Sequence, residues 1–240
     1  MKVDWMEASW PAPPNVRAVS TTRAGGFSAG RWTGLNLGTR CGDDPDHVRR
    51  NRALVDHLLP SPAHWVRQVH GTAVAKIDDL VGNDDEADAI VSFRPGQVCA
   101  ILTADCLPVF FCNQAGDRVA IAHAGWRGLA GGVLASTVAA LQEQPSRLLA
   151  WLGPAIGPGA YEVGHEVAEA FSSEFPHGFS ARGDRFLMDL YTVARLKLRA
   201  CGVDRVFGGG LCTFSEPDRF FSYRRDGETG RMAHFAWLAE

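Results

Sequence analysis

The sequence lacks a long apolar run, an apolar leader and any concentrated run of basic residues. Charged side chains occupy positions 2, 4 and 7, where the apolar core of a signal peptide would lie. The most apolar stretch, 98–112, is interrupted by Thr103, Asp105 and Pro108, whereas a membrane-spanning helix needs about 20 consecutive apolar residues. The net charge is only −3, without the basic field that binds nucleic acid or an anionic membrane surface. We therefore expect a cytoplasmic protein that binds neither nucleic acid nor a membrane.

The six cysteines include no Cys-x-x-Cys pair, the usual mark of a structural zinc site or a redox dithiol. In a chain of 240 residues without an expected export signal, reduced thiols are favoured over disulfides. Before their neighbours are considered, most of these cysteines are expected to be small buried residues.

Internal repeats, low-complexity tracts and linkers are also absent, which predicts a single domain spanning 1–240. Apolar patterns predict strands at 16–21, 65–69, 89–92, 98–102, 109–112, 118–123, 148–152, 220–224 and 232–238. Patterns of period 3.6 predict helices from 45 to about 59 and at 131–141, 164–175 and 190–200. Several strands follow one another without room for a crossover helix. We therefore expect an α+β fold with mixed, largely antiparallel sheets covered by helices.

Three metal-capable side chains, His70, Cys106 and His123, stand where predicted strands end. Such positions commonly carry functional groups, because the sheet holds them in place. The separations of 36 and 17 residues do not match a zinc finger. Two imidazoles and one thiolate suit a catalytic Zn²⁺ whose fourth position is open to water, where the pKa of that water falls to about 7. The same residues also suit a metal-free site with Cys106 as the nucleophile and a histidine as its base, and the sequence does not separate the two.

Longer motifs run through almost the whole chain. They are Ser20-Thr21-Thr22-Arg23-Ala24-Gly25-Gly26, Gly34-Leu35-Asn36-Leu37-Gly38, Gly42-Asp43-Asp44-Pro45, Gln68-Val69-His70-Gly71, Thr103-Ala104-Asp105-Cys106-Leu107-Pro108-Val109, His123-Ala124-Gly125-Trp126-Arg127-Gly128, Gly153-Pro154-Ala155-Ile156-Gly157-Pro158 and Phe221-Ser222-Tyr223-Arg224-Arg225-Asp226. Through this set the chain resembles the YfiH family, whose members are also called laccase-domain or polyphenol-oxidase-like proteins, purine nucleoside phosphorylases and peptidoglycan editing factors. One departure is visible, because many relatives have cysteines after the Gly-Pro-x-Ile-Gly-Pro motif, where this chain has Gly159-Ala160.

The resemblance implies a four-layer α/β/β/α sandwich and a zinc ion bound by His70, Cys106 and His123. It also implies phosphorolysis of adenosine, inosine and S-methyl-5′-thioadenosine by inorganic phosphate to base and ribose 1-phosphate, together with deamination of adenosine. A copper-binding polyphenol oxidase is disfavoured, because a multicopper oxidase draws on several His-x-His pairs and the eight histidines contain none. Copper is the alternative occupant of the single site, since copper(II) outcompetes zinc at many nitrogen and sulfur sites.

Further site residues follow from the implied chemistry. Asp105, beside Cys106, is either the catalytic acid that moves a proton during deamination or a side chain that hydrogen-bonds its own loop. Arg23 and Arg127 are the candidates for binding phosphate, because the planar guanidinium donates two parallel hydrogen bonds. Asn36 either binds the base or ribose or closes its own turn.

Two other classes of function remain open. A metal-free Cys-His hydrolase or amidase that edits peptidoglycan precursors would resist chelators and be sensitive to thiol alkylation. A non-catalytic partner protein with a structural zinc would turn over no substrate and would expose an apolar patch of several hundred Å².

Overall fold

The structure is a computed structural model that describes residues 3–80, 82, 85–171 and 176–240. Its strands are β1 (Trp5–Glu7), β2 (Val16–Thr21), β3 (His64–Trp65), β4 (Val74–Lys76), β5 (Ala89–Ser92), β6 (Cys99–Thr103), β7 (Leu107–Asn113), β8 (Val119–Ala124), β9 (Leu148–Leu152), β10 (Glu162–Val163), β11 (Phe179–Arg182), β12 (Arg185–Met188), β13 (Arg205–Gly208) and β14 (Met232–Leu238). Its α-helices are α1 (Pro45–Asp56), α2 (Trp126–Gly131), α3 (Val133–Ala140), α4 (His165–Glu169), α5 (Leu190–Ala200) and α6 (Tyr223–Asp226). No helix within the described ranges has the length and apolar character needed to cross a membrane.

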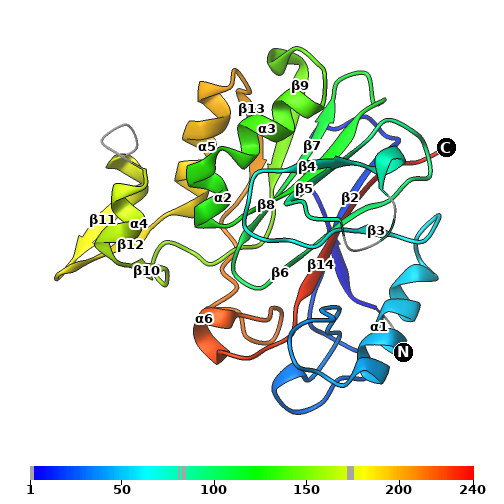
Figure 1. The fold of residues 1–240 in the computed structure, drawn as a ribbon, viewed down its shortest axis with the longest axis horizontal. Helices are drawn as coiled ribbons and strands as arrows, with labels where there is room; N and C mark the ends of the chain where they lie inside the picture. Colours follow the sequence, from blue (N-terminus) through cyan, green and yellow to red (C-terminus); the bar gives the residue numbers. More distant parts are fainter. Residues whose placement is uncertain (1–2, 81, 83–84, 172–175) are drawn as a thin grey trace.

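Two mixed sheets pack face to face between helices, which confirms the predicted four-layer α/β/β/α sandwich (Figure 1). One sheet has the strand order β1-β2-β14-β6-β3, and the other has the order β13-β9-β7-β8-β5-β4. Most strand pairs are antiparallel, while β3–β6, β4–β5 and β9–β13 are parallel. Helices α2, α3 and α5 cover the outer face of the six-stranded sheet, and α1 covers the five-stranded one.

Three apolar clusters fill the three interfaces between these layers. The cluster between the sheets contains Ile101 and Phe110, the cluster under α2, α3 and α5 contains Phe111, and the cluster under α1 contains Phe235. Neighbouring side chains of β7 alternate between two of these clusters, so both faces of the strand are buried. A strand buried on both faces has a continuous apolar sequence, which explains the apolar run at 98–112.

Local signals set the ends of the helices. The side chain of Asp44 accepts a hydrogen bond from the Asp46 amide and Pro45 follows at the first position, so α1 begins as predicted and ends at Asp56. The predicted helix at 131–141 is interrupted by Gly132, whose φ of 97° ends α2, and α3 then continues to Ala140. The predicted helix at 164–175 is observed only as α4, which ends at Glu169, and the predicted part at 172–175 lies outside the described residues.

Two predicted strands differ from the structure. The strand predicted at 220–224 is wrong, because Ser222 caps the short helix α6 by accepting a hydrogen bond from the Arg225 amide. The strand predicted at 65–69 is reduced to β3, and the residues after it turn toward the candidate site. A small sheet of order β10-β12-β11, which the sequence patterns did not indicate, lies to one side of the sandwich (Figure 1).

Candidate functional site

The three predicted metal-capable residues come from three neighbouring parts of the sandwich. His70 lies in the loop between β3 and β4, Cys106 lies in the turn between β6 and β7, and His123 is on β8. Strands β7 and β8 pair with Pro108 opposite His123 and Leu107 opposite Ala124, so Cys106 comes directly before the paired end of this hairpin. Sheet pairing therefore brings Cys106 beside His123, and the loop that carries His70 completes the group.

The donor atoms of His70, Cys106 and His123 all lie within 4.8 Å of one another. The Sγ atom of Cys106 is 3.9 Å from Nε2 of His70, and the two imidazole rings are 4.7 Å apart between centroids. His123 is buried, Cys106 is partly buried and His70 is exposed, so the group faces outward through His70.

Two residues at the site have left-handed backbone conformations that are uncommon for any residue except glycine. The φ angle is 60° at His70 and 94° at Asp105. Such a conformation costs of the order of 1–3 kcal/mol and persists only where surrounding contacts hold it. At Asp105 these contacts come from its own side chain, which accepts hydrogen bonds from the Thr213 hydroxyl and the Arg224 amide.

Asp88 is a site residue that the sequence analysis missed. Its carboxylate accepts hydrogen bonds from the backbone amides of Val69, His70 and Gly71. It also binds Nδ1 of His123 at 2.8 Å. The available signal was an acid between two alanines, directly before the apolar strand at 89–92, because an acid is rarely buried without partners.

These contacts shift the pKa values of the site. Burial alone would raise the pKa of Cys106, but the neighbouring His123 and His70 outweigh it and lower the pKa to about 6. Burial alone would lower the pKa of His123, but Cys106 and Asp88 outweigh it and raise the pKa to about 9. The pKa of Asp88 is lowered because the hydrogen bonds from His123 and the backbone amides outweigh its burial. Without a metal, the cysteine and histidine thus form a thiolate–imidazolium pair near neutral pH.

The donor set fits a single metal ion. Two imidazole nitrogens and one thiolate are ligands for zinc or copper. Since Nδ1 of His123 is engaged by Asp88, the atom left for a metal is Nε2. A histidine ligand whose other ring nitrogen binds a carboxylate is the common arrangement in metalloproteins. Among the described residues, this is the one group of three or more His, Cys, Asp or Glu side chains close enough to share an ion.

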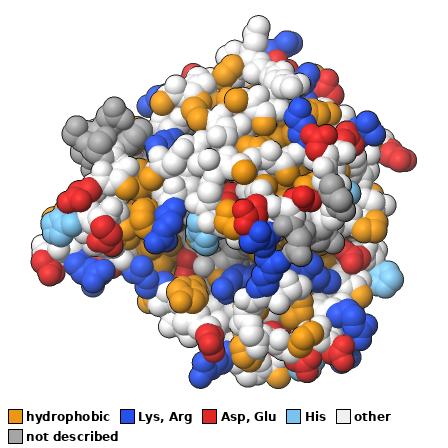
Figure 2. Space-filling model, viewed as in Figure 1, with side chains coloured by type: hydrophobic (Ala, Val, Ile, Leu, Met, Phe, Trp, Pro, Cys, Tyr) orange, Lys and Arg blue, Asp and Glu red, His pale blue; other side chains and the backbone are white. Residues whose placement is uncertain are grey.

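A cavity of about 960 Å³ opens over the three donors. Four aromatic side chains line it, namely Trp65, Trp126, Tyr161 and Tyr223. Six arginines line it, namely Arg40, Arg52, Arg67, Arg127, Arg224 and Arg231. A band of Lys and Arg side chains crosses the middle of the face shown in Figure 2. Aromatic faces together with guanidinium groups suit a ligand that is partly planar and partly anionic.

Of the other predicted site residues, Asp105 and Arg127 line this cavity. One carboxylate oxygen of Asp105 accepts a hydrogen bond from the Thr213 hydroxyl, and the other accepts one from the Arg224 amide. These contacts suit a side chain that anchors its loop, the alternative to a catalytic acid. Arg127 is exposed, with its guanidinium 4.3 Å from the centre of the Trp126 ring. It has no hydrogen-bond partner within the described part of the chain, so its donors are unused in this cavity wall.

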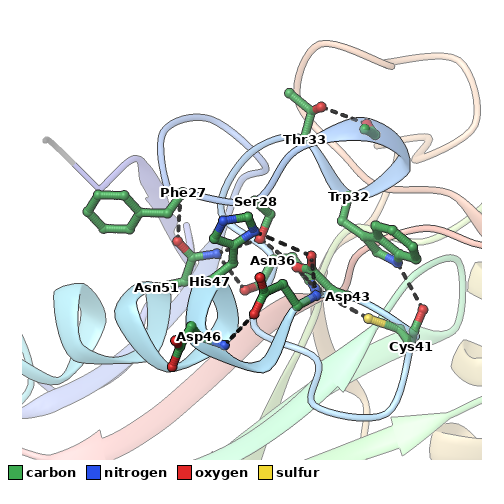
Figure 3. Close-up of polar contacts among 12 residues, drawn as sticks. Phe27, Ser28, Trp32, Thr33, Asn36, Cys41, Asp43, Asp46, His47 and Asn51 are labelled. Carbon is green, nitrogen blue, oxygen red and sulfur yellow. Dashed lines mark hydrogen bonds and ion pairs between the residues drawn. The ribbon is translucent and has the colours of Figure 1, made fainter.

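Arg23 and Asn36 lie outside the residues that line the cavity. The guanidinium of Arg23 donates to the carbonyls of Pro217 and Thr33. The fully buried Asn36 side chain donates to Asp43 and accepts from the amides of Gly38 and Arg231, within the polar cluster drawn in Figure 3. These contacts join the loop before α1 to the rest of the fold.

Comparisons with known proteins agree with this architecture. The model of the family described as multi-copper polyphenol oxidoreductase laccase matches residues 17–239. The chain belongs to this family. It is 52% identical over 234 residues to purine nucleoside phosphorylase YfiH of Escherichia coli (strain K12), covering 95% of this chain and 96% of that protein. It is 49% identical to purine nucleoside phosphorylase PA4543 of Pseudomonas aeruginosa, covering 98% and 99% of the two chains.

A solved structure, protein NMB0706 from Neisseria meningitidis, superposes with a TM-score of 0.96 at 49% identity, covering 99% of this chain and 100% of that one. The predicted membership of the YfiH family and its fold are therefore confirmed. The family description names several coppers, whereas the described residues offer the one three-donor group above.

Proposed function

We propose that the chain is a zinc-dependent purine nucleoside phosphorylase that acts on adenosine, inosine and S-methyl-5′-thioadenosine and also deaminates adenosine. In phosphorolysis the bond between the base and C1′ breaks, a phosphate oxygen bonds to C1′, and the base leaves with a proton. The observation that carries the proposal is one cavity that joins the His70–Cys106–His123 group to aromatic walls and to the unused donors of Arg127. The names of the relatives support the reaction.

Each group of the cavity has a proposed task. Arg127 binds phosphate through its guanidinium, because it lines the cavity and its donors have no hydrogen-bond partner among the described residues. Tyr161 and Trp126 offer planar faces to the purine base. Asp105 holds the Cys106 turn through Thr213. A zinc ion held by His70, Cys106 and His123 would supply a Lewis acid at the inner end of the cavity.

Product analysis tests the reaction. Purified protein is incubated with adenosine, with and without inorganic phosphate, and the products are identified by mass spectrometry. Adenine and ribose 1-phosphate that form only with phosphate support phosphorolysis, and inosine supports deamination. If none of the three nucleosides is phosphorolysed or deaminated, the proposed function is ruled out.

Metal analysis tests the centre separately. We expect about one zinc per chain, loss of activity with a chelator and recovery with added zinc. Cys106→Ser should lose both zinc and turnover, whereas the matched control Cys201→Ser, a partly buried cysteine at the end of α5, should keep both. Recovery with copper but not zinc would correct the identity of the metal.

The second candidate is a metal-free Cys-His hydrolase or amidase acting on peptidoglycan precursors. It is favoured by one observation, the lowered pKa of Cys106 beside His123, because a thiolate activated by histidine is a nucleophile. Activity that resists chelation and disappears on alkylation of Cys106 would support this candidate over the phosphorylase.

A further inference from the structure

We propose that Asp88 is the positioning residue of the metal centre, because its one carboxylate sets the ring nitrogen that His123 offers and the backbone turn that carries His70. The inference rests on the metal site proposed above and not on the reaction carried out there. It assigns a role to a residue that contacts neither the ion nor a substrate.

The first part of the argument concerns His123. An ionised carboxylate only accepts hydrogen bonds, so the nitrogen that it contacts must carry the proton. Oδ1 of Asp88 lies 2.8 Å from Nδ1 of His123. This contact assigns the proton to Nδ1 and leaves Nε2 for the ion. It also fixes the rotation of the ring about its Cβ–Cγ bond.

The second part concerns His70. Oδ2 of Asp88 accepts from the amide of Gly71 at 2.6 Å and from that of Val69 at 3.2 Å, and Oδ1 accepts from the amide of His70 at 2.9 Å. Three consecutive amides on one carboxylate hold the chain in the turn where His70 has its φ of 60°. If the three hydrogen bonds to Asp88 were lost, they would no longer offset the cost of the left-handed conformation at His70. The His70 ring would then move away from Cys106.

The third part concerns the stiffness of the support. Asp88 directly precedes β5, and its backbone carbonyl accepts from the His123 amide at 2.7 Å. Its own amide donates to the Ala73 carbonyl at the end of the His70 loop. Asp88 is completely buried. The residue is therefore held by backbone hydrogen bonds on both sides, and its carboxylate has a fixed position relative to the two histidines.

The test compares Asp88→Asn with Asp43→Asn. Asparagine keeps the size of the side chain but turns one acceptor oxygen into a donor, which must then face an N–H group. Asp43 is the matched control, since its side chain is only 3% exposed and accepts hydrogen bonds from Ser28, Asn36 and the Asp44 amide (Figure 3). It is not among the residues that line the cavity. Zinc affinity is measured by competition with a chelator of known affinity, and thermal stability is measured on the same samples.

We expect both variants to lower the melting temperature but only Asp88→Asn to weaken zinc binding, by about 10- to 100-fold. Wild-type zinc affinity in Asp88→Asn, or an equal loss in Asp43→Asn, would overturn the inference and leave the metal site standing. If the wild-type chain binds no zinc, the proposed metal site fails and the inference fails with it.

A measurement on the wild-type protein covers the case in which Asp88→Asn does not fold. In a ¹H–¹⁵N spectrum of the zinc-loaded protein, the imidazole of His123 should carry its proton on Nδ1, with Nε2 unprotonated. A proton on Nε2, with Nδ1 bound to the ion, would overturn the inference. The backbone amides of Val69, His70 and Gly71 should also exchange slowly with solvent, although Val69 is itself an exposed residue.

Discussion

The sulfur atom of Cys106 lies 3.9 Å from Nε2 of His70, although these residues are 36 positions apart and belong to different loops. Neither loop has a regular structure of its own that would impose this distance. Strand pairing sets it instead. Asp88, the anchor of the His70 loop, directly precedes β5, and β5 pairs with β8, which also pairs with β7 beyond Cys106. Substitutions that alter the distance between Cys106 and His70 are therefore expected to change the geometry of the whole site.

Cys106 in the metal-free protein should react with iodoacetamide at neutral pH. Its pKa of about 6 means that the thiolate fraction grows as pH rises through 6 and is nearly complete by pH 8. The alkylation rate should follow this fraction. Mass spectrometry of peptides from protein treated between pH 5 and 9 measures it for each cysteine.

Cys201 is the internal control, because burial raises the pKa of its thiol and its alkylation should remain slow at pH 7. The variant His123→Ala should move the Cys106 profile to higher pH, since the charge and hydrogen bond of His123 are what lower the pKa against the effect of burial. A Cys106 profile unchanged by His123→Ala would contradict the assigned cause.

Gly125→Ala should disrupt the site with little effect on the fold. A Cβ atom at this position would lie 2.9 Å from Sγ of Cys106 and 3.1 Å from Cδ2 of His70. The backbone of Gly125, with φ −68°, is open to alanine, so the effect is steric and local. We expect about a hundredfold loss of turnover, because displacements near 1 Å misplace reacting groups.

Gly159→Ala is the matched control, since a Cβ atom there meets nothing within 4 Å. Turnover and zinc content of both variants should be measured together with their unfolding midpoints. Equal activity of Gly125→Ala and Gly159→Ala would show that the close approach at Gly125 does not matter to the site.

The sequence was sufficient to predict the strands that build the site, because their apolar runs are long and uninterrupted. Strands β2, β5, β9 and β14 have the predicted bounds. The three metal-capable residues followed from their chemistry at strand ends. The segment 220–224 was misjudged because Phe220 and Phe221 are buried in the core without belonging to a strand. Burial alone does not distinguish an apolar strand from an apolar turn.

Long-range hydrogen bonds could not be predicted in the same way. Asp88 meets His123 across 35 positions, and Asp105 meets Thr213 across 108. The pairing of a polar side chain with a distant backbone group depends on the completed sheet order, which local periodicity does not contain. For the same reason, the sequence left open whether Asn36 binds substrate or closes its own turn, whereas its side chain bonds Asp43 and the Gly38 amide.

Arg127→Ala should raise the KM for phosphate by about 10- to 100-fold, the loss expected for a hydrogen bond to a charged group. The expectation follows because Arg127 lines the cavity and has no hydrogen-bond partner among the described residues. Arg23→Ala serves as the comparison, because the Arg23 guanidinium donates hydrogen bonds to the carbonyls of Thr33 and Pro217. It should lower stability by about 1 kcal/mol and leave this KM unchanged. Initial rates over a range of phosphate concentrations check both, and the reverse result would return Arg23 to the phosphate site.

His234 should make the protein less stable in acid. The ring is fully buried between the hydroxyls of Thr103 and Ser20, each 2.8 Å from a ring nitrogen. Burial and, secondarily, the charge of His123 lower its pKa to about 3, compared with about 6.5 in the unfolded chain. Between these values the unfolded chain binds a proton that the folded chain does not. The free energy of unfolding should therefore fall as pH falls, by up to about 1.4 kcal/mol per pH unit from this residue.

His234→Gln separates this contribution from those of other groups, because glutamine has a donor and an acceptor for the two hydroxyls but no charge to gain in acid. Urea unfolding of both proteins between pH 6 and 4, with a chelator present so that metal loss adds no pH dependence, measures the difference. The wild-type stability should decline more steeply than that of His234→Gln. Parallel pH profiles would mean that His234 takes up its proton in the folded state, and that Thr103 and Ser20 do not hold it neutral.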